Sequence, residues 1–303
     1  MKPKVSIGVC AKNAQDTICF AIESVMQQDF NHNLIEIVFV DDGSDDNTLK
    51  IMKETASTID FRVKIFSSGW RGIGKARNTV VENAEGEYIV WLDSDEIIEG
   101  DFLRKQIELM ELNPQAGIAM GKLGLLPDAN ILLTLDHLPY VAEFSTRDCN
   151  NPSKLPGTGG TTYRLAAVKE VGGFNEEFQG ACEDTEVAYR MTKAGWSVIR
   201  GEGLYYESHG QMSTLGTSWT RSIKRGISSR KLFDKNNIFF SFYRINPFAS
   251  LLVSFRYAVL SYLLTKRKIS FLLPFYFTFK MTAWFLGFTR TEKKDQHNLF
   301  DFF

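Results

Sequence analysis

The segment Gly86-Glu87-Tyr88-Ile89-Val90-Trp91-Leu92-Asp93-Ser94-Asp95 carries the strongest structural signal in the sequence. Residues 88–92 are all apolar or β-forming, which predicts a strand buried on both faces, as in a parallel sheet. Ligands of open α/β sheets bind beyond the carboxyl ends of the strands, so we expect Asp93 and Asp95 at a ligand site. Two carboxylates this close repel each other unless a cation separates them, most commonly a divalent ion bound to a phosphate. An acidic turn followed by a helix cap is the alternative interpretation.

The first third of the chain alternates between short apolar strands and helical segments. Strands are expected at residues 5–10, 36–40 and 62–66, and helices at residues 17–27 and 75–83. This alternation predicts a parallel, doubly wound sheet of the Rossmann kind. The first strand is not followed by G-x-G-x-x-G, which argues against a dinucleotide cofactor.

Length and cysteine usage narrow the class of protein. The chain has 303 residues, enough for one large or two smaller domains. Its four cysteines, Cys10, Cys19, Cys149 and Cys182, show no C-x-x-C spacing, which argues against a zinc site and favours reduced thiols over two disulfides. Met1-Lys2-Pro3-Lys4 leads directly into the first strand without an apolar signal segment, so we expect a cytosolic chain.

The near-zero net charge hides an asymmetry between the two parts of the chain. Residues 221–303 contain 15 Lys and Arg against 4 Asp and Glu, whereas residues 1–220 contain 20 against 32. The basic part also holds 20 of the 39 aromatic residues. An acidic front joined to a basic, aromatic back indicates a membrane surface or a polyanion as the partner of the back.

Small and acidic residues are concentrated in the middle of the chain. Gly157-Thr158-Gly159-Gly160-Thr161 would let the backbone approach a ligand closely, although an ordinary loop has the same composition. Gly180-Ala181-Cys182-Glu183-Asp184-Thr185-Glu186 precedes a helix expected at residues 187–194. Taken alone, Asp184 and Glu186 would cap that helix and complement its dipole.

Four motifs in the front half resemble the nucleotide-sugar half of a family 2 glycosyltransferase. They are Val5-Ser6-Ile7 through Asn13, Ile37-Val38-Phe39-Val40-Asp41-Asp42-Gly43-Ser44-Asp45-Asp46, Gly74-Lys75-Ala76-Arg77-Asn78, and Glu85-Gly86-Glu87-Tyr88 leading into Asp93-Ser94-Asp95. Enzymes of that family are inverting and have the GT-A fold. The order of the motifs is more specific than any one of them.

The resemblance implies roles for the polar residues of these motifs. Asp42 would contact the nucleotide base and Asp93 the ribose or the metal, while Asp95 would be the direct ligand of Mg²⁺ or Mn²⁺ on the diphosphate. Lys75 and Arg77 would offset phosphate charge, and solvent exposure is the alternative for both. The full nucleotide-sugar site would comprise Cys10, Asn13, Asp42, Lys75, Arg77, Asp93 and Ser94.

The middle of the chain resembles the acceptor half of the same family, because Gly172-Gly173-Phe174-Asn175 is followed by Glu183 and Asp184. The resemblance implies that Asp184 is the catalytic base, which takes the acceptor proton in an inverting transfer. Gly159 and Gly160 would belong to the acceptor loop. Glu183 is expected to point away from Asp184, since neighbours in a helix do not share a face, and to orient the loop.

Two features after the acceptor motifs are expected to complete the site. His209 follows a short β-like segment, where many GT-A enzymes place a histidine near the metal or the diphosphate; a structural or solvated histidine is the alternative. Residues 221–244 carry a net charge of +6, and a mobile basic linker would close over the diphosphate through Arg221 and Arg225. Attraction to anionic lipid headgroups is the competing interpretation, and both can hold.

Residues 247–264 and 271–288 are apolar and close to the length that spans a bilayer. Each carries a central cation, Arg256 or Lys280, which costs about 2.5–3.5 kcal/mol at the membrane midplane. The basic loop between the stretches conflicts with the positive-inside rule for a spanning hairpin. We therefore expect helices that lie in the cytoplasmic leaflet, with a hairpin or an apolar oligomer contact as alternatives. A tail of this length is too short for a polymer-conducting channel, so a processive polysaccharide synthase is not expected.

These expectations divide the chain into a GT-A domain at residues 1–220, with halves at 1–112 and 113–220, a basic linker at 221–244 and a membrane-associating region at 245–303. The predicted protein is a monotopic, metal-dependent inverting glycosyltransferase at the cytoplasmic face of the cell membrane. Its donor would be a UDP- or GDP-linked sugar, and its acceptor a polyprenyl-linked molecule or a glycan. Nucleic acid is not expected as a partner, and homo-oligomer formation stays open. A nucleotidyltransferase and an inactive membrane adaptor are the alternatives.

Overall fold

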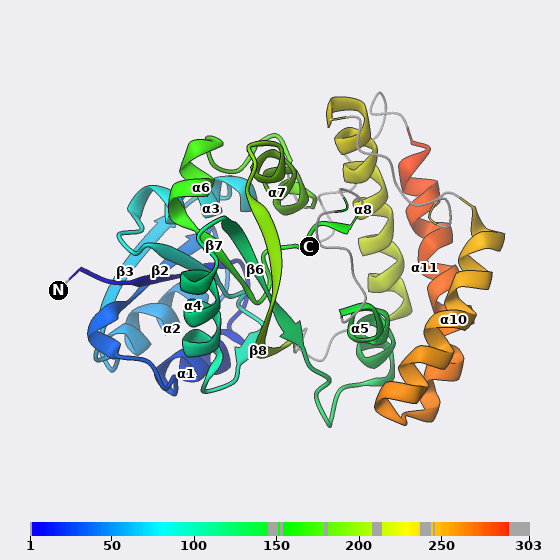
Figure 1. Cartoon of the computed structure of the whole chain (residues 1–303), viewed down its shortest axis with the longest axis horizontal. Coiled ribbons are helices and arrows are strands. Elements are labelled where there is room, and N and C mark those ends of the chain that lie inside the picture. The colour runs from blue at the N-terminus through cyan, green and yellow to red at the C-terminus, as the bar shows by residue number, and fades with distance from the viewer. Residues whose placement is uncertain are drawn as a thin grey trace.

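The computed structural model describes residues 2–144, 151, 154–178, 181–207, 214–236, 244 and 246–290. The strands are β1 (Val5–Ala11), β2 (Ile35–Asp42), β3 (Arg62–Ser68), β4 (Tyr88–Trp91), β5 (Glu96–Ile98), β6 (Ala116–Leu123), β7 (Thr161–Arg164) and β8 (Ser197–Glu207). The helices are α1 (Ile18–Met26), α2 (Thr48–Ala56), α3 (Ile73–Asn83), α4 (Phe102–Leu112), α5 (Ile131–Phe144), α6 (Leu165–Glu170), α7 (Glu183–Lys193), α8 (Leu215–Asn236), α10 (Pro247–Thr265) and α11 (Leu273–Phe288). The strands form one eight-stranded sheet in the order β3-β2-β1-β4-β7-β6-β8-β5, with helices on both faces (Figure 1).

One half of the sheet, made of β3, β2, β1 and β4, is parallel, as the alternation of strands and helices predicts. The other half is mixed, since β7 runs antiparallel to β4 and β6, and β5 runs antiparallel to β8. The expected α/β fold class is confirmed, and the parallel half places the ends of β1, β2 and β4 at one edge.

Side chains of β4 alternate between two apolar cores, one on each face of the sheet. Tyr88 and Val90 belong to the core that includes α1 and α4, and Ile89 and Trp91 to the core that includes α3 and α7. Successive residues of a strand point to opposite faces, so a strand covered on both sides needs an unbroken apolar run. Each large side chain buried in this way contributes about 1.5–3 kcal/mol relative to an exposed one.

Helix α8 is continuous from Leu215 to Asn236 and so crosses the domain boundary expected at residue 220. The linker expected from residue 221 is therefore helical as far as residue 236. The reason is a stripe of small buried side chains at helical spacing, which lets the helix pack against a neighbour. The stripe consists of Ser218, Ser222, Gly226 and Ser229.

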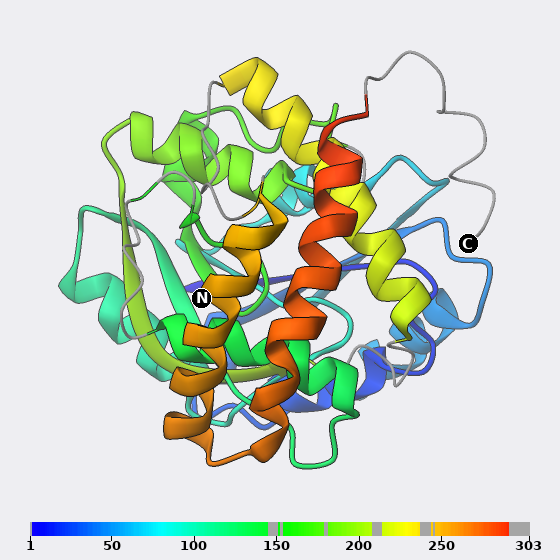
Figure 2. The ribbon, with the colours of Figure 1, turned by 90° about the vertical axis from the view of Figure 1, so that its right-hand side faces the viewer.

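Helices α8 and α11 pack side by side through their backbones (Figures 1 and 2). A Cβ added at Gly226 would overlap the carbonyl oxygen of Trp284, and one added at Gly287 would overlap that of Ile223. Only glycine leaves room for two helices to approach this closely. The basic helix and the apolar helix are therefore held together as one unit.

Helix α5 connects the apolar helices to the sheet. Asp136 forms a partly buried ion pair with Lys280 of α11 and accepts a 3.0 Å hydrogen bond from the hydroxyl of Tyr276. Glu143, further along α5, accepts a hydrogen bond from the hydroxyl of Tyr257 in α10. The central cation of the second apolar stretch is thus neutralised by a protein carboxylate.

Two segments, Phe248–Thr265 and Lys268–Phe288, are long and apolar enough to cross a membrane by length and composition alone. This is weak evidence by itself, because core helices of soluble proteins pass the same test. Here, however, only 28% and 33% of the two segments are buried. Large apolar side chains are exposed along α10 at Phe248, Leu252, Phe255, Val259 and Leu263.

Candidate active site

The acidic turn, Asp93-Ser94-Asp95, connects β4 to β5 at the carboxyl end of the parallel strands. Glu96, the first residue of β5, is 1% exposed. Its Oε2 accepts hydrogen bonds from the backbone N–H of Asp93 (2.8 Å) and of Gly160 (3.1 Å). Its Oε1 has no hydrogen-bond partner in the described part of the chain. Glu96 therefore fixes the shape of the turn and ties it to the loop that precedes β7.

This glycine loop, residues 157–160, lies between the acidic turn and the predicted base. A Cβ added at Gly159 would overlap Oε1 of Glu96, and one added at Gly157 would lie 2.9 Å from Oδ2 of Asp184. Any larger residue at these positions would displace a carboxylate. The loop thus packs against Glu96 on one side and Asp184 on the other, two acidic residues that are distant in the sequence.

Asp184 is held in place by its own helix terminus. Its Oδ1 accepts hydrogen bonds from the backbone N–H (2.6 Å) and the hydroxyl (3.2 Å) of Thr185. It lies in the first turn of α7, where the helix dipole favours negative charge. Because Thr185 occupies Oδ1, Oδ2 is the oxygen directed at the glycine loop.

Arg77 of α3 joins the two halves of the site. Its guanidinium forms a buried ion pair with Glu183, the first residue of α7, and lies 3.5 Å from Oδ1 of Asp93. It also lies over the rings of Trp91 and Phe174, at 6.0 and 5.7 Å from their centroids. The side chain is 6% exposed, so the solvent-exposed alternative for Arg77 is wrong.

The electrostatic environment raises the pKa of two carboxyl groups beside Arg77. Burial and the charge of Asp184 raise the pKa of Glu183 to about 7, although Arg77 opposes the shift. Loss of surrounding water raises the pKa of Asp93 to about 6, again against Arg77, with further contributions from Asp95 and Glu207. Several carboxylates therefore compete for few positive charges, which is the situation that a bound cation relieves.

Glu207, at the end of β8, is a member of this acidic group that the sequence analysis missed. It lies opposite Glu96 in the β5–β8 pair, and its charge helps to raise the pKa of Glu96 well above the ordinary range, after burial and Asp93. Its Oε2 lies 3.1 Å from Nε2 of His137, a buried residue of α5. Only the register of two distant strands brings these residues together, so no local motif could have revealed them.

Helix α8 brings basic residues to the same side of the molecule. Loss of surrounding water lowers the pKa of Arg225, but the charges of Tyr140, Asp136, Glu207 and Asp184 raise it on balance. The side chains of Arg225 and of Arg221, one helical turn earlier, are both exposed. The two arginines predicted to contact the diphosphate thus lie on a packed helix instead of a mobile linker.

Asp42 and Asn13 hold loops at the ends of β2 and β1. Oδ1 and Oδ2 of Asp42 accept hydrogen bonds from the backbone N–H groups of Arg71 (2.8 Å) and Gly72 (3.0 Å). The side-chain oxygen of Asn13 accepts a 2.9 Å hydrogen bond from the backbone N–H of Asp45. Both residues therefore shape the edge of the expected base site.

The remaining predicted residues have different surroundings. Cys10 lies among Arg77, Asp93 and Asp42, and burial raises the pKa of its thiol to about 12. Lys75 forms ion pairs with Glu176 at 3.3 Å and with Glu82 at 3.8 Å, so two carboxylates of the protein already balance its charge. Ser94 lies in the acidic turn, half-buried, and His209 lies outside the described residues.

The acidic group has the chemistry of a divalent-cation site. In the described ranges, no three His, Cys, Asp or Glu side chains are arranged as a complete metal site. The donors at hand are nevertheless carboxylate oxygens, which Mg²⁺ and Mn²⁺ prefer, and the buried Oε1 of Glu96 lacks a hydrogen-bond partner there. The residues Asp93, Asp95 and Glu207 thus supply the type of donor that such an ion takes, without being arranged as a complete site in the described ranges.

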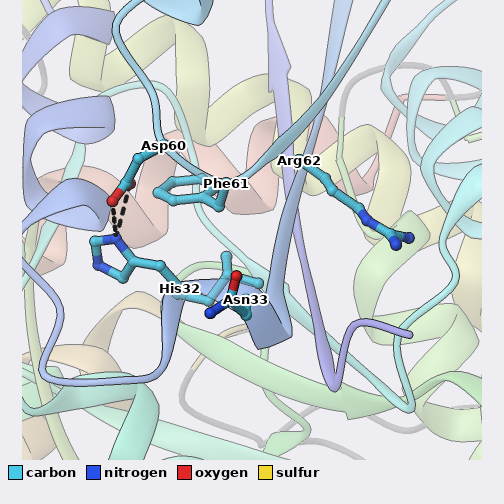
Figure 3. Close-up of a pocket in the computed structure, with 6 residues that line it drawn as sticks. His32, Asn33, Asp60, Phe61 and Arg62 are labelled. Carbon is cyan, nitrogen blue, oxygen red and sulfur yellow. Dashed lines mark hydrogen bonds and ion pairs between the residues drawn. The ribbon is translucent and has the colours of Figure 1, made fainter. Parts of the chain in front are cut away.

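A pocket elsewhere on the sheet does not take part in this site (Figure 3). It is lined at the amino ends of β2 and β3, where Nδ1 of His32 lies 2.8 Å from Oδ1 of Asp60 and the imidazole stands edge-on to Phe61. Ligands of parallel sheets bind at the opposite, carboxyl ends. The acidic turn is therefore the better candidate.

Comparison with known families gives two overlapping matches. Residues 6–126 match the family described as Glycosyl transferase family 2, and residues 88–289 match Glycosyl transferase family group 2. The poly(ribitol-phosphate) β-N-acetylglucosaminyltransferase TarS of Staphylococcus aureus is 34% identical over 101 residues, which are 33% of this chain and 18% of TarS. The poly-β-1,6-N-acetyl-D-glucosamine synthase of Staphylococcus epidermidis is 25% identical over 191 residues, which are 62% and 45% of the two chains. The chain thus spans less than half the length of these relatives.

Solved structures share the fold over nearly the whole chain. The mannosyltransferase PcManGT of Pyrobaculum calidifontis, in complex with GDP-Man and Mn²⁺, has a TM-score of 0.66 at 18% identity and covers 93% of this chain and 86% of its own. TarS 1–349 of S. aureus has a TM-score of 0.55 at 19% identity and covers 94% and 90%. Both likenesses extend beyond the sheet into the helical part of the chain.

Proposed function

Because this chain belongs to glycosyl transferase family 2 and has the GT-A fold, we propose that it is an inverting, metal-dependent enzyme that moves a sugar from a nucleoside-diphosphate donor to an acceptor hydroxyl. The observation that carries this proposal is the glycine loop, which touches Glu96 on one side and Asp184 on the other. A transfer between two substrates needs donor and acceptor groups held at one place, and this loop provides that arrangement.

Asp184 is the proposed base. An inverting transfer requires a group that accepts the acceptor proton while its oxygen attacks the anomeric carbon from the side opposite the leaving diphosphate. Oδ1 of Asp184 is engaged by Thr185, and Oδ2 is directed at Gly157. Glu183 is held by Arg77, which makes it the positioning neighbour of the base.

The acidic turn is the proposed donor site. Asp95, with Asp93 and Glu207 beside it, would hold Mg²⁺ or Mn²⁺, which supplies positive charge to the diphosphate when bound. Arg225 lies close enough to Tyr140, Asp136, Glu207 and Asp184 for their charges to raise its pKa, and it is the basic residue of α8 that we propose to contact the same phosphates. Neighbours of this fold were solved with UDP-GlcNAc and with GDP-Man, and we propose a UDP- or GDP-linked sugar here.

The exposed side of α10 is the proposed membrane-binding surface. Its apolar side chains lie at helical spacing from Phe248 to Leu263, and Lys266 and Lys268 are exposed at its end. Apolar burial flanked by lysines is the composition of helices that lie at the surface of anionic lipids. The ion pair between Lys280 and Asp136 holds α11 against the catalytic part, which supports a helix pair lying at the surface over a spanning hairpin.

A membrane-bound enzyme of this kind would act at the cytoplasmic face, where nucleotide sugars are its donors. We propose a lipid-linked acceptor, with a polyprenyl carrier as the first choice, since membrane docking brings no advantage toward a freely soluble acceptor. A glycan held at the membrane is the second choice.

A ligand-stabilisation experiment tests the donor part of this proposal. UDP and GDP, each with and without Mn²⁺, would be added to the full chain during thermal unfolding. A ligand at 100 times its dissociation constant adds about 2.7 kcal/mol of stability, which is easily measured. At least one nucleotide should stabilise the parent in Mn²⁺ and fail to stabilise Asp95→Ala. Equal behaviour of parent and variant would assign the acidic turn to a helix-capping role.

The acceptor part needs a transfer assay. Sugar transfer from the nucleotide that binds would be followed to polyprenyl phosphate in liposomes and to a soluble oligosaccharide. Transfer that is confined to the soluble acceptor would contradict a lipid-linked substrate without contradicting donor use.

A further inference from the structure

The carboxylate of Asp42, which was expected to contact the nucleotide base, already accepts hydrogen bonds from the protein backbone. The residue is 5% exposed, and each carboxylate oxygen accepts one backbone N–H, from Arg71 and from Gly72. Charge-assisted hydrogen bonds of this kind are about twice as strong as neutral ones. Asp42 therefore fixes the loop that follows β3, residues 69–72, at the carboxyl end of β2.

The same loop is held from a second side. Gly43 adopts a left-handed conformation with φ of 74°, and a Cβ there would lie 2.5 Å from the backbone nitrogen of Trp70. Gly72 adopts φ of 89° at the start of α3. Two glycines thus allow the loop backbone to pack directly on the end of β2, which leaves Trp70 little freedom.

This loop carries Trp70, whose side chain is half exposed to solvent. Trp70 is 50% exposed, and Nζ of Lys12 lies 5.1 Å from its ring centroid. Lys12 directly follows the end of β1, so the cation and the ring come from adjacent parts of the same sheet edge. An exposed cation–π contact contributes about 0.5–1 kcal/mol, which helps to hold the ring in one orientation.

We propose that the indole of Trp70 stacks on the base of the nucleoside-diphosphate donor. The inference rests on the proposed function, because it concerns the same donor site. The ring stands at the carboxyl ends of β1, β2 and β3, where a doubly wound sheet binds ligands, and Asp42 and Lys12 fix it there. Stacking of a base on an aromatic side chain contributes about 1–3 kcal/mol and tolerates any base. Trp70 therefore strengthens nucleotide binding without selecting UDP or GDP.

Nucleotide affinities of two Trp70 variants test this role. Isothermal titration in Mn²⁺ would measure the dissociation constants of UDP and GDP for the parent, Trp70→Ala and Trp70→Phe. Trp70→Ala should bind about 5- to 150-fold more weakly, which is the stacking energy converted to affinity. Trp70→Phe keeps an aromatic face and should stay within about 5-fold of the parent.

Two controls separate stacking from other effects. Inorganic pyrophosphate has no base, so in Mn²⁺ it should bind the parent and Trp70→Ala equally. Phe271→Ala removes an exposed aromatic ring from the segment between α10 and α11 and should leave nucleotide affinity unchanged.

The outcomes distinguish this inference from the proposed function. Equal nucleotide affinities of the parent and Trp70→Ala would overturn the stacking role and leave donor binding intact. If Trp70→Ala lost affinity for pyrophosphate and for the nucleotides equally, the stacking role would also be overturned, because the loop would then bind the diphosphate. A parent that binds neither nucleotide would overturn the proposed function, and the role of Trp70 with it.

Discussion

Arg77 and Glu183 form a buried ion pair although 106 positions separate them in the sequence. Arg77 belongs to α3, which precedes β4, and Glu183 begins α7, which precedes β8. The same guanidinium lies 3.5 Å from Asp93. The position of α7, and of Asp184 in its first turn, therefore depends on a contact with α3.

Replacing Arg77 by methionine should lower the free energy of unfolding by about 3–5 kcal/mol, because it leaves Glu183 buried without its partner. Urea denaturation of the parent and the variant would measure the difference. The double variant Arg77→Met/Glu183→Gln should lose less than the sum of the two single variants, since neither charge is then left alone. Strict additivity would show that the pair has no coupling energy.

The free energy of unfolding should fall as the pH rises from about 4.5 to about 7. Burial and the charge of Asp184 raise the pKa of Glu183 from its ordinary 4.5 to about 7 in the folded protein. The folded state then binds more protons than the unfolded state across this interval. The contribution of Glu183 to the free energy of unfolding is therefore fully present below about pH 4.5 and is lost as the pH rises to about 7. Thermal unfolding of Glu183→Gln should depend less on pH than that of the parent. An identical dependence would assign the slope to other carboxyl groups.

Asp184→Asn should lower turnover about 10²- to 10⁴-fold, because asparagine keeps the size and polarity of the side chain but cannot accept the proton. Its affinity for the nucleoside diphosphate should stay within a few-fold of the parent value, as the donor contacts lie on the other side of the glycine loop. Single-turnover kinetics and calorimetry would measure both quantities. Near-parental turnover would remove Asp184 from the mechanism, whereas a joint loss of donor binding would make it part of the donor site.

Gly159→Ala should lower both stability and turnover, because the added methyl group would overlap Oε1 of Glu96. Overpacking of this kind costs about 1–3 kcal/mol. Gly216→Ala, in α8, is the matched control, since a Cβ at that position meets nothing closer than 3.7 Å. Denaturation and activity of the two variants would be compared. If Gly159→Ala behaved like the control, the close approach of the loop would not matter for the site.

Leu252→Glu should weaken sedimentation with anionic liposomes, because it places a negative charge on the exposed apolar side of α10. Leu112→Glu is the control: Leu112 is 80% exposed and Leu252 is 74% exposed, but Leu112 lies at the end of α4. Added salt should weaken binding of the parent without abolishing it, since apolar burial persists when charge is screened. Equal binding of both variants, or full release of the parent at moderate salt, would contradict docking through α10.

The parallel half of the sheet could be predicted because each strand carries its own signal. Residues 37–40 and 88–92 are apolar runs that are directly followed by acidic residues, and a short-range pattern suffices to recognise them. The mixed half could not be predicted in this way. β5 has only three residues, and its pairing with β8 depends on contacts distant in the sequence.

The candidate site divides along the same line. Motif order singled out Asp93 and Asp184, and the structure brings them to one loop. Glu207 and His137 escaped notice because strand register and the packing of α5 bring them together. The basic residues after 220 suggested a linker, whereas the small side chains between Ser218 and Ser229 at helical spacing were the signal for a packed helix.

The contact between α8 and α11 has a mechanical consequence. At Gly226 and Gly287 the helices meet through α-carbons and carbonyl oxygens, with no layer of side chains between them. Side chains could change rotamer and absorb a displacement, but backbones in direct contact cannot. A shift of α11 is therefore transmitted to α8 and to Arg225, the neighbour of Gly226. Docking of the apolar helices at a membrane would therefore also change the position of Arg225 relative to the nearby acidic residues.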